Sequence, residues 1–294
     1  MRTLTDREKK KATSQAGKWS TPGSRLANLA VHAALIIGIF MVIAPFLWTI
    51  TASLKSKPSM IWRAPYFYPT TFAWENYVEA WKTASFSRFY LNTAIMTGAL
   101  VLGQVFLSAM AAYAFARLQF FGRNTLFLVF LGTTMIPFFV IMLPSYLIVE
   151  KLGWLDTYWA LTVPRLVSAF AIFLLRQAFL GIPKELDEAA CMDGCSAWKT
   201  LWLIIMPLSK PALAAVAIFA FLFGWNDFLW PLLVTRSPEM STIQIGLTSF
   251  QGRYYNDQVH LMAAVTTATI PSLLLFIVAQ RYFVRGVATI GLKG

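Results

Sequence analysis

The stretch ANLAVHAALIIGIFMVIAPFLWTIT, from Ala27 to Thr51, contains no Asp, Glu, Lys or Arg. About twenty apolar residues in helical conformation cross the hydrocarbon core of a bilayer, where every backbone polar group must be satisfied within the segment. A polar tail precedes the stretch, and no convincing cleavage site of small residues follows it. We therefore expect a retained membrane helix rather than a removed signal peptide.

The whole chain shares the character of this stretch. Of its 294 residues, 57% are hydrophobic and 13% are charged, and the mean hydropathy is +0.60. Soluble domains contain about 25% charged residues, so this chain has more apolar surface than a fold in water can hide. The composition predicts a membrane protein.

Six segments are long and apolar enough to cross a bilayer. They are Ala27–Thr51, Phe89–Phe115, Leu126–Ile148, Tyr158–Leu175, Pro211–Leu233 and Leu261–Phe283, and Pro164 and Arg165 interrupt the fourth. The sequence thus predicts an all-α, polytopic protein with one transmembrane domain at residues 26–283. A basic tail at residues 1–25 precedes this domain, and a short tail at residues 284–294 follows it.

The distribution of basic residues predicts that both termini are cytoplasmic. Sixteen of the 25 Lys and Arg residues fall in the two tails and in the loops on the same side, eight fall in the other loops, and Arg165 lies within a span. Basic residues accumulate on the cytoplasmic side of membrane proteins. This placement also explains the +12 net charge without a nucleic-acid partner, and it brings the N-terminal tail close to anionic membrane lipids.

Few residues offer catalytic or metal chemistry. Cys191 and Cys195 lie four apart with no metal-ligand spacing around them, and we interpret them as packing residues. His32 and His260 lie far from any catalytic partner and are expected to be structural. In the loop after the first span, a group of aromatic residues is expected near the membrane interface: Trp62, Tyr66, Tyr68, Trp74 and Trp81.

A polar segment, ELDEAACMDGCSAWKTLWLIIMP from Glu185 to Pro207, separates the fourth and fifth spans. Pro183 suits the first position of a helix and Gly194 suits its end, which predicts one short helix over Pro183–Asp193 and a second from Ser196 to Pro207. One face of the first helix is expected to contain Ile182, Leu186, Ala189, Ala190 and Asp193. Such a helix fits a groove in another protein or lies flat on the membrane, and the spacing alone leaves both open.

The residues Glu188-Ala189-Ala190, then Gly194, then Ile204, then Met206-Pro207 resemble the EAA loop of ABC-importer permeases. Met206 in place of the usual Leu is the one departure from the family pattern. In that family the loop forms a coupling helix in a cleft of a cytoplasmic ATPase. The resemblance implies this coupling role for Glu188, Ala189, Ala190, Asp193, Gly194 and Pro207.

Three further stretches are similar to the second permease subunit of carbohydrate ABC importers, the one like the smaller maltose-system permease. They are AFAIFLLRQ (Ala169–Gln177), WNDFLWP (Trp225–Pro231) and the C-terminal QRYFVRG and GLKG. The resemblance covers the chain from about Ala27 and implies a type I ABC importer. In such an assembly the chain pairs with a related permease, two ATPase subunits and an extracytoplasmic solute-binding protein, and Lys293 and Gly294 contact the ATPase. The chain lacks the glycine-rich phosphate loop, so ATP and Mg are expected on the partner ATPases and no enzymatic activity on this chain.

Polar residues inside spans usually face a cavity or a partner. Asn226 and Asp227 are candidates for the substrate pathway, with Trp225 and Trp230 offering flat faces to a sugar; alternatively, the tryptophans lie at the interface and Asp227 caps or pairs. Arg165 is expected to bind freed carbonyls, to pair with a neighbouring helix, or to face an anionic substrate. The last option would suit acidic saccharides such as alginate fragments.

Three alternatives fit these residues less well than a carbohydrate ABC importer does. An ABC permease for glycerol phosphate or amino acids fits the same loop. A secondary transporter driven by an ion gradient would need carboxylates near the midplane, and Asp227 alone approaches that position. A membrane-embedded enzyme finds no catalytic constellation in the sequence.

Overall fold

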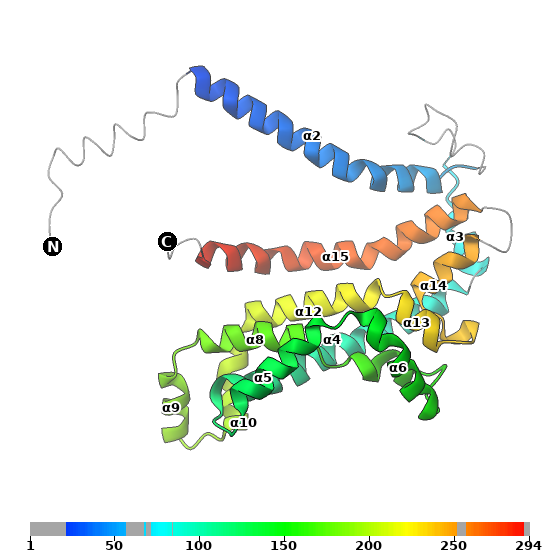
Figure 1. The fold of residues 1–294 in the computed structure, drawn as a ribbon. Coiled ribbons are helices and arrows are strands. Elements are labelled where there is room, and N and C mark those ends of the chain that lie inside the picture. Colours follow the sequence, from blue (N-terminus) through cyan, green and yellow to red (C-terminus); the bar gives the residue numbers. More distant parts are fainter. Residues whose placement is uncertain (1–21, 57–67, 69–71, 84, 252–256, 291–294) are drawn as a thin grey trace.

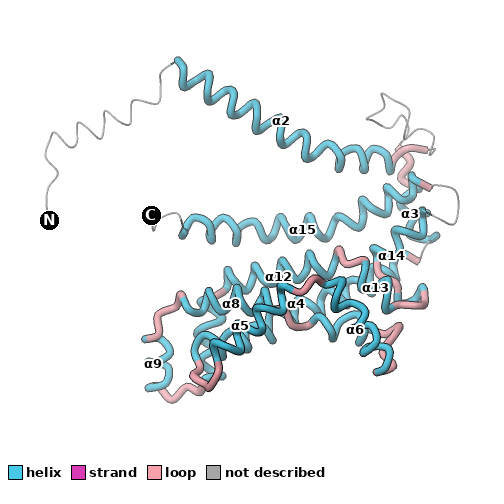
Figure 2. The backbone as a smooth tube through the Cα atoms, viewed as in Figure 1, coloured by secondary structure: helices cyan, strands magenta, loops and turns pink. Residues whose placement is uncertain are grey.

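The computed structural model describes residues 22–56, 68, 72–83, 85–251 and 257–290, and every regular element among them is helical (Figures 1 and 2). Three helices are long and apolar enough to cross a membrane: α2 (Pro22–Ser53), α4 (Phe86–Arg117) and α15 (Gln258–Ile290). They contain the first, second and sixth predicted spans, which are confirmed.

Three pairs of consecutive helices are long and apolar enough to cross a membrane together, but each pair is bent at a short break. In the first pair, α5 (Arg123–Gly132) and η3 (Thr133–Met135) precede α6 (Phe138–Lys151), with a bend of 100°. In the second, α7 (Tyr158–Thr162) and η4 (Val163–Arg165) precede α8 (Ala169–Leu180), with a bend of 43°. In the third, α10 (Ala197–Thr200), η5 (Leu201–Ile205) and α11 (Met206–Leu208) precede α12 (Lys210–Trp225), with a bend of 84°. With each bent pair taken as one span, the total is six. The expected number of spans therefore agrees with the structure.

Three of the predicted spans are not continuous helices: the interruption of the fourth near Pro164 and Arg165 was predicted, whereas the breaks in the third and fifth were not. The third breaks at Ile136, whose extended backbone (φ −83°, ψ 117°) precedes Pro137, a residue without an N–H. A residue before proline is disfavoured in helical conformation, which explains the break. The fifth ends at Trp225 and resumes after residues 226–228 as α13 (Leu229–Val234).

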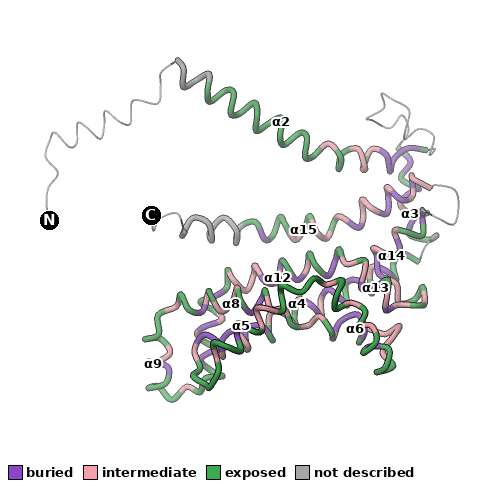
Figure 3. The backbone as a smooth tube through the Cα atoms, in the orientation of Figure 1, coloured by how far each residue is buried: buried purple, intermediate pink, exposed green. Residues whose placement is uncertain are grey.

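The centre of the bundle is α4, which packs against α8 and α12. At Gly224 on α12 an added Cβ would lie 3.1 Å from the Thr97 Oγ1 and from Leu100 Cδ1 of α4, so a side chain larger than hydrogen has little room there. This close approach joins the two helices next to the break that follows Trp225. Figure 3 shows buried residues concentrated along these central elements.

The helix α2 stands apart from the bundle (Figure 1). Its most apolar stretch, which is long enough to cross a membrane, has no buried residue. It contacts α15 where Trp48 and Ala52 pack with Val259 and Met262. Nearby lie the short elements of one end of the molecule: α3 (Glu75–Thr83), η6 (Pro238–Met240), α14 (Ile243–Thr248) and η7 (Ser249–Gln251). The opposite end carries α9 (Glu185–Met192).

Several predictions fall on residues outside the described ranges. They concern residues 1–21 of the basic tail, Trp62 and Tyr66, and the C-terminal Lys293 and Gly294. Of the other loop aromatics, Tyr68 and Trp74 are well exposed. Their predicted position at a membrane interface stays a prediction.

Candidate functional site

A cavity of about 640 Å³ lies among the broken spans. It is lined by side chains of α4, α6, the α7–α8 break, α12 and α13, including Gln104, Phe138, Arg165, Ser168, Phe223 and Trp230. Most of its wall is aromatic or aliphatic, with few polar groups. A space of this size and lining is typical of sites for small molecules.

Arg165 and Asp227, predicted separately, meet at this cavity. Their side chains form an ion pair and are 12% and 8% exposed, respectively. Each residue lies at or beside a break in its span, where the chain leaves regular helix. Of the three alternatives for Arg165, the structure shows the pairing with a neighbouring span.

Aromatic rings and an amide complete the surroundings of Arg165. The guanidinium carbon lies 4.2 Å from the Phe223 ring centroid and 5.2 Å from that of Phe138. Gln104 of α4 donates a hydrogen bond from its amide to the Arg165 carbonyl oxygen over 3.0 Å. The break in the fourth span is therefore held by a side chain of the central helix, and the cation has both a carboxylate and π faces around it.

The two tryptophans differ in their surroundings. Trp230 lines the cavity, is 1% exposed, and donates from its indole N–H to the Ala160 carbonyl over 2.9 Å. Trp225 does not line the cavity; it stacks on Phe221 with ring centroids 5.4 Å apart and donates to the Ala268 carbonyl. In this conformation its ring is part of the core, because neighbouring helices cover it. Its predicted contact with a substrate stays a prediction.

Asn226 is exposed and donates its amide to the Leu222 carbonyl over 2.8 Å. The same carbonyl also accepts the backbone N–H of Asn226 over 3.2 Å, so the side chain and the backbone of Asn226 both cap the last turn of α12. The structure assigns it to the break itself and not to the cavity wall. Its predicted role in the substrate pathway likewise stays a prediction.

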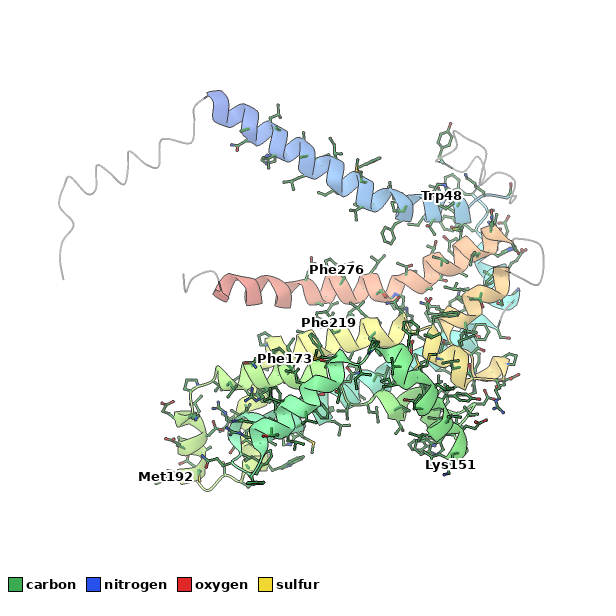
Figure 4. All side chains as sticks on the ribbon, in the orientation of Figure 1. Trp48, Lys151, Phe173, Met192, Phe219 and Phe276 are labelled. Carbon is green, nitrogen blue, oxygen red and sulfur yellow. The ribbon has the colours of Figure 1, made fainter. Side chains whose placement is uncertain are left out.

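At the far end of the molecule, the polar segment forms the two short helices that were predicted. The helix α9 ends at Met192, and Gly194 adopts φ +78°, a left-handed conformation that reverses the chain. Ser196 caps the next helix, because its hydroxyl accepts from the Lys199 N–H over 3.4 Å. Figure 4 shows Met192, 89% exposed, at the tip of this unit.

The predicted faces of α9 need one correction. Glu188, Ala189 and Asp193 are exposed, whereas Ala190 is 4% exposed and packs inward. Successive residues of a helix are about 100° apart, so Ala189 and Ala190 need not share a surface. Pro207 is exposed on α11, after a turn of π-helix over Leu201–Ile205 that is anchored in the core.

A second ion pair, not predicted from the sequence, ties α9 to the bundle. Arg117 is the last residue of α4, and its Nε lies 3.2 Å from the Asp187 Oδ2. The same guanidinium donates from Nη2 to the Ile182 carbonyl over 2.7 Å, and the Arg117 side chain is 5% exposed. A basic residue that closes a long apolar span was the available signal, but it served only as a marker of membrane orientation.

Bent spans around a mainly apolar cavity, joined at one end to an exposed helical unit, define a multi-pass membrane permease. The chain belongs to the family of binding-protein-dependent transport system inner membrane components, whose model matches residues 104–289. It is therefore an inner-membrane transport subunit of bacterial type, and the resemblance seen in its sequence is confirmed.

Similar proteins support this assignment. An arabinooligosaccharides transport system permease protein of Halalkalibacterium halodurans is 37% identical over 258 residues, which cover 87% of this chain and 92% of the relative. An sn-glycerol-3-phosphate transport system permease protein of Rhizobium meliloti is 36% identical, with 89% of this chain and 96% of the relative covered. A solved bacterial ABC transporter involved in the import of the acidic polysaccharide alginate shares the fold, with a TM-score of 0.80 at 23% identity over 90% of this chain and 98% of that chain.

Proposed function

We propose that this chain is one of two related permease subunits of an ATP-driven saccharide importer. Two ATPase subunits and an extracytoplasmic solute-binding protein complete the assembly, and both termini of this chain face the cytoplasm. The arabinooligosaccharide permease among the relatives supports the saccharide, and the excess of Lys and Arg in the tails supports the orientation. The phosphorylated polyol carried by another relative is the second candidate substrate.

The observation that carries the proposal is the exposed unit of α9, Gly194 and α10. It projects from one end of the bundle, and it presents a carboxylate at Glu188 beside a large apolar side chain at Met192. A helix with such a surface fits a groove in a partner, as helix-in-groove recognition requires. We assign that groove to an ATPase subunit.

The Arg117–Asp187 ion pair and the hydrogen bond from Gln104 to the Arg165 carbonyl suggest how movement of α9 reaches the cavity. Asp187 joins α9 to Arg117 at one end of α4, and Gln104, thirteen residues earlier on the same helix, holds the break at Arg165. At 1.5 Å per residue these two points are about 20 Å apart along a single helix. A rigid helix that is fixed at both points transmits a tilt of α9 to the cavity wall.

In the proposed cycle, closure of the ATPase subunits on ATP carries α9 with them. The central helix α4 then tilts against α8 and α12, and the cavity opens to the extracytoplasmic side. Hydrolysis resets the arrangement and releases the saccharide inside. Since these steps are rigid-body movements between packed helices, they need differential contacts in the two states, which the docked α9 supplies.

The test is reconstitution of the complete complex in liposomes, with uptake and ATP hydrolysis measured together. Glu188→Lys is expected to weaken ATPase docking, while Glu185→Lys reverses a charge one turn earlier and serves as its control. Gly194→Pro is expected to uncouple hydrolysis from uptake, because proline cannot adopt φ +78°, whereas Gly194→Asn tolerates that conformation. Normal uptake by Glu188→Lys and Gly194→Pro, or uptake without any ATPase subunit, would contradict the proposal.

A further inference from the structure

The charge of the cavity indicates which saccharides it admits. We infer that the Arg165–Asp227 ion pair makes the cavity selective for uncharged saccharides, with Asp227 as the residue that sets this selectivity. The inference rests on the proposed function, since it concerns the substrate of the same permease. It excludes uronate-containing chains as preferred substrates of this site, and it decides against the phosphorylated polyol named above as the second candidate substrate.

The cation at the cavity is already paired. Arg165 is the charged side chain among the described residues that line the cavity. Its guanidinium already pairs with Asp227, and the Phe223 and Phe138 rings lie 4.2 and 5.2 Å from it. An anionic substrate would therefore have to displace a carboxylate that is already in place.

Displacing the Asp227 carboxylate from Arg165 is energetically unfavourable. In the ion pair the Asp227 side chain is only 8% exposed, so a substrate that takes the guanidinium would leave the carboxylate without its partner at a largely covered position. A buried carboxylate without a partner is strongly unfavourable in a medium of low dielectric constant. The competition thus favours the resident carboxylate, and an acidic saccharide gains no net charge compensation.

The rest of the cavity wall is mainly aromatic or aliphatic. Phe170 and Phe219 meet edge to face with centroids 5.5 Å apart, and Phe138 meets Trp230 in the same way at 6.3 Å. Aromatic faces bind the C–H faces of sugar rings, and the hydroxyl of Ser168 at the wall offers a polar contact for a sugar hydroxyl. This lining matches an uncharged saccharide better than a polyanion.

The experiment uses two trisaccharides that differ only at C6. They are α-1,4-linked galactotriose, which is neutral, and trigalacturonate, in which each C6 carries a carboxylate; arabinotriose is added as a second neutral probe. Binding to the complex of permease and ATPase subunits in nanodiscs is measured by saturation-transfer NMR and by calorimetry. The solute-binding protein is left out, so that only the membrane site discriminates between the saccharides.

The wild-type complex is expected to bind a neutral probe and to bind trigalacturonate at least about tenfold more weakly. Asp227→Asn leaves the Arg165 charge without its partner and is expected to raise the ratio of acidic to neutral affinity by about tenfold or more. The double variant Asp227→Asn/Arg165→Gln removes both charges and is expected to restore the neutral preference. A folding defect from Asp227→Asn alone would not be reversed in this way.

Equal affinity of the wild type for both trisaccharides, or an unchanged ratio in Asp227→Asn, would overturn the inference. So would failure of all three probes to bind. These outcomes leave the proposed function intact as long as the complex still imports a saccharide with ATP, so the two proposals fail separately.

Discussion

Replacing Arg117 with methionine should separate ATP hydrolysis from transport. The substitution keeps a long apolar side chain at the end of α4 and removes the guanidinium that contacts Asp187 and the Ile182 carbonyl. The connection between α9 and α4 then loses its ion pair. Hydrolysis is expected to continue, whereas the stimulation of hydrolysis by loaded binding protein and the uptake of saccharide are expected to fall together.

The geometry sets the size of the effect. With the Arg117 Nε 3.2 Å from the Asp187 Oδ2, the gross Coulomb attraction at an effective dielectric constant of 20 is about 5 kcal/mol. Removing one partner of a fully buried pair costs about 3–5 kcal/mol. Because the Asp187 side chain is 21% exposed, water compensates part of that cost, and we expect about 2 kcal/mol. A change of that size alters a conformational equilibrium about thirtyfold.

The assay compares uptake per ATP hydrolysed in proteoliposomes with the midpoint of thermal unfolding in detergent. The control is Arg176→Met, which removes a guanidinium from α8; that group donates to the Phe115 carbonyl and lies over the Phe127 ring. Arg176→Met is expected to keep the ratio of uptake to hydrolysis.

The double variant Arg117→Met/Asp187→Asn distinguishes a mechanical role from a structural one. It no longer leaves a carboxylate without a partner, so the unfolding midpoint is expected to recover, while uptake per ATP stays low. Wild-type coupling in Arg117→Met, or recovery of coupling together with stability in the double variant, would refute the reasoning.

Three other predictions follow from the packing. Asp156 has φ 61°, and its carboxylate accepts hydrogen bonds from the backbone N–H groups of Arg236 and Ser237. Partial burial acts to raise the pKa of Asp156, but these N–H donors outweigh it and hold the pKa below the ordinary 3.8. The stability from this contact is complete above pH 3.8 and is lost as the pH falls through the lower pKa of the folded state. Hydrogen exchange at these two amides should therefore rise in acid. Asp156→Asn should abolish this dependence on pH. Gly224→Leu should push α12 from Thr97, where an added Cβ already lies within 3.1 Å of the hydroxyl, and should lower the unfolding midpoint, with Gly224→Ala less harmful. Trp230→Ala should cost about 3–5 kcal/mol of unfolding free energy, because the side chain is 1% exposed, and a retained midpoint would contradict this.

Hydropathy was sufficient to find the spans but not their breaks. A window of apolar residues reports the affinity of a segment for lipid, and Leu126–Ile148 has that affinity whether it is one helix or two. The break at Ile136 depends on the conformational restriction that Pro137 imposes, and it was visible in the sequence only as a proline. Asn226 and Asp227 were recognised as unusual residues in a span, but not as the place where the helix stops.

The sequence by itself determined the class of protein, the number of spans and the position of the exposed helical unit. These properties depend on local composition and on short-range turn chemistry, such as the left-handed residue at Gly194. Only the tertiary structure decided that Arg165 pairs with Asp227, that Arg117 pairs with Asp187, and which tryptophan faces the cavity. The physical reason is that a charge in a span needs a partner, but the identity of that partner depends on which helix faces meet across the bundle, and no local pattern contains that information.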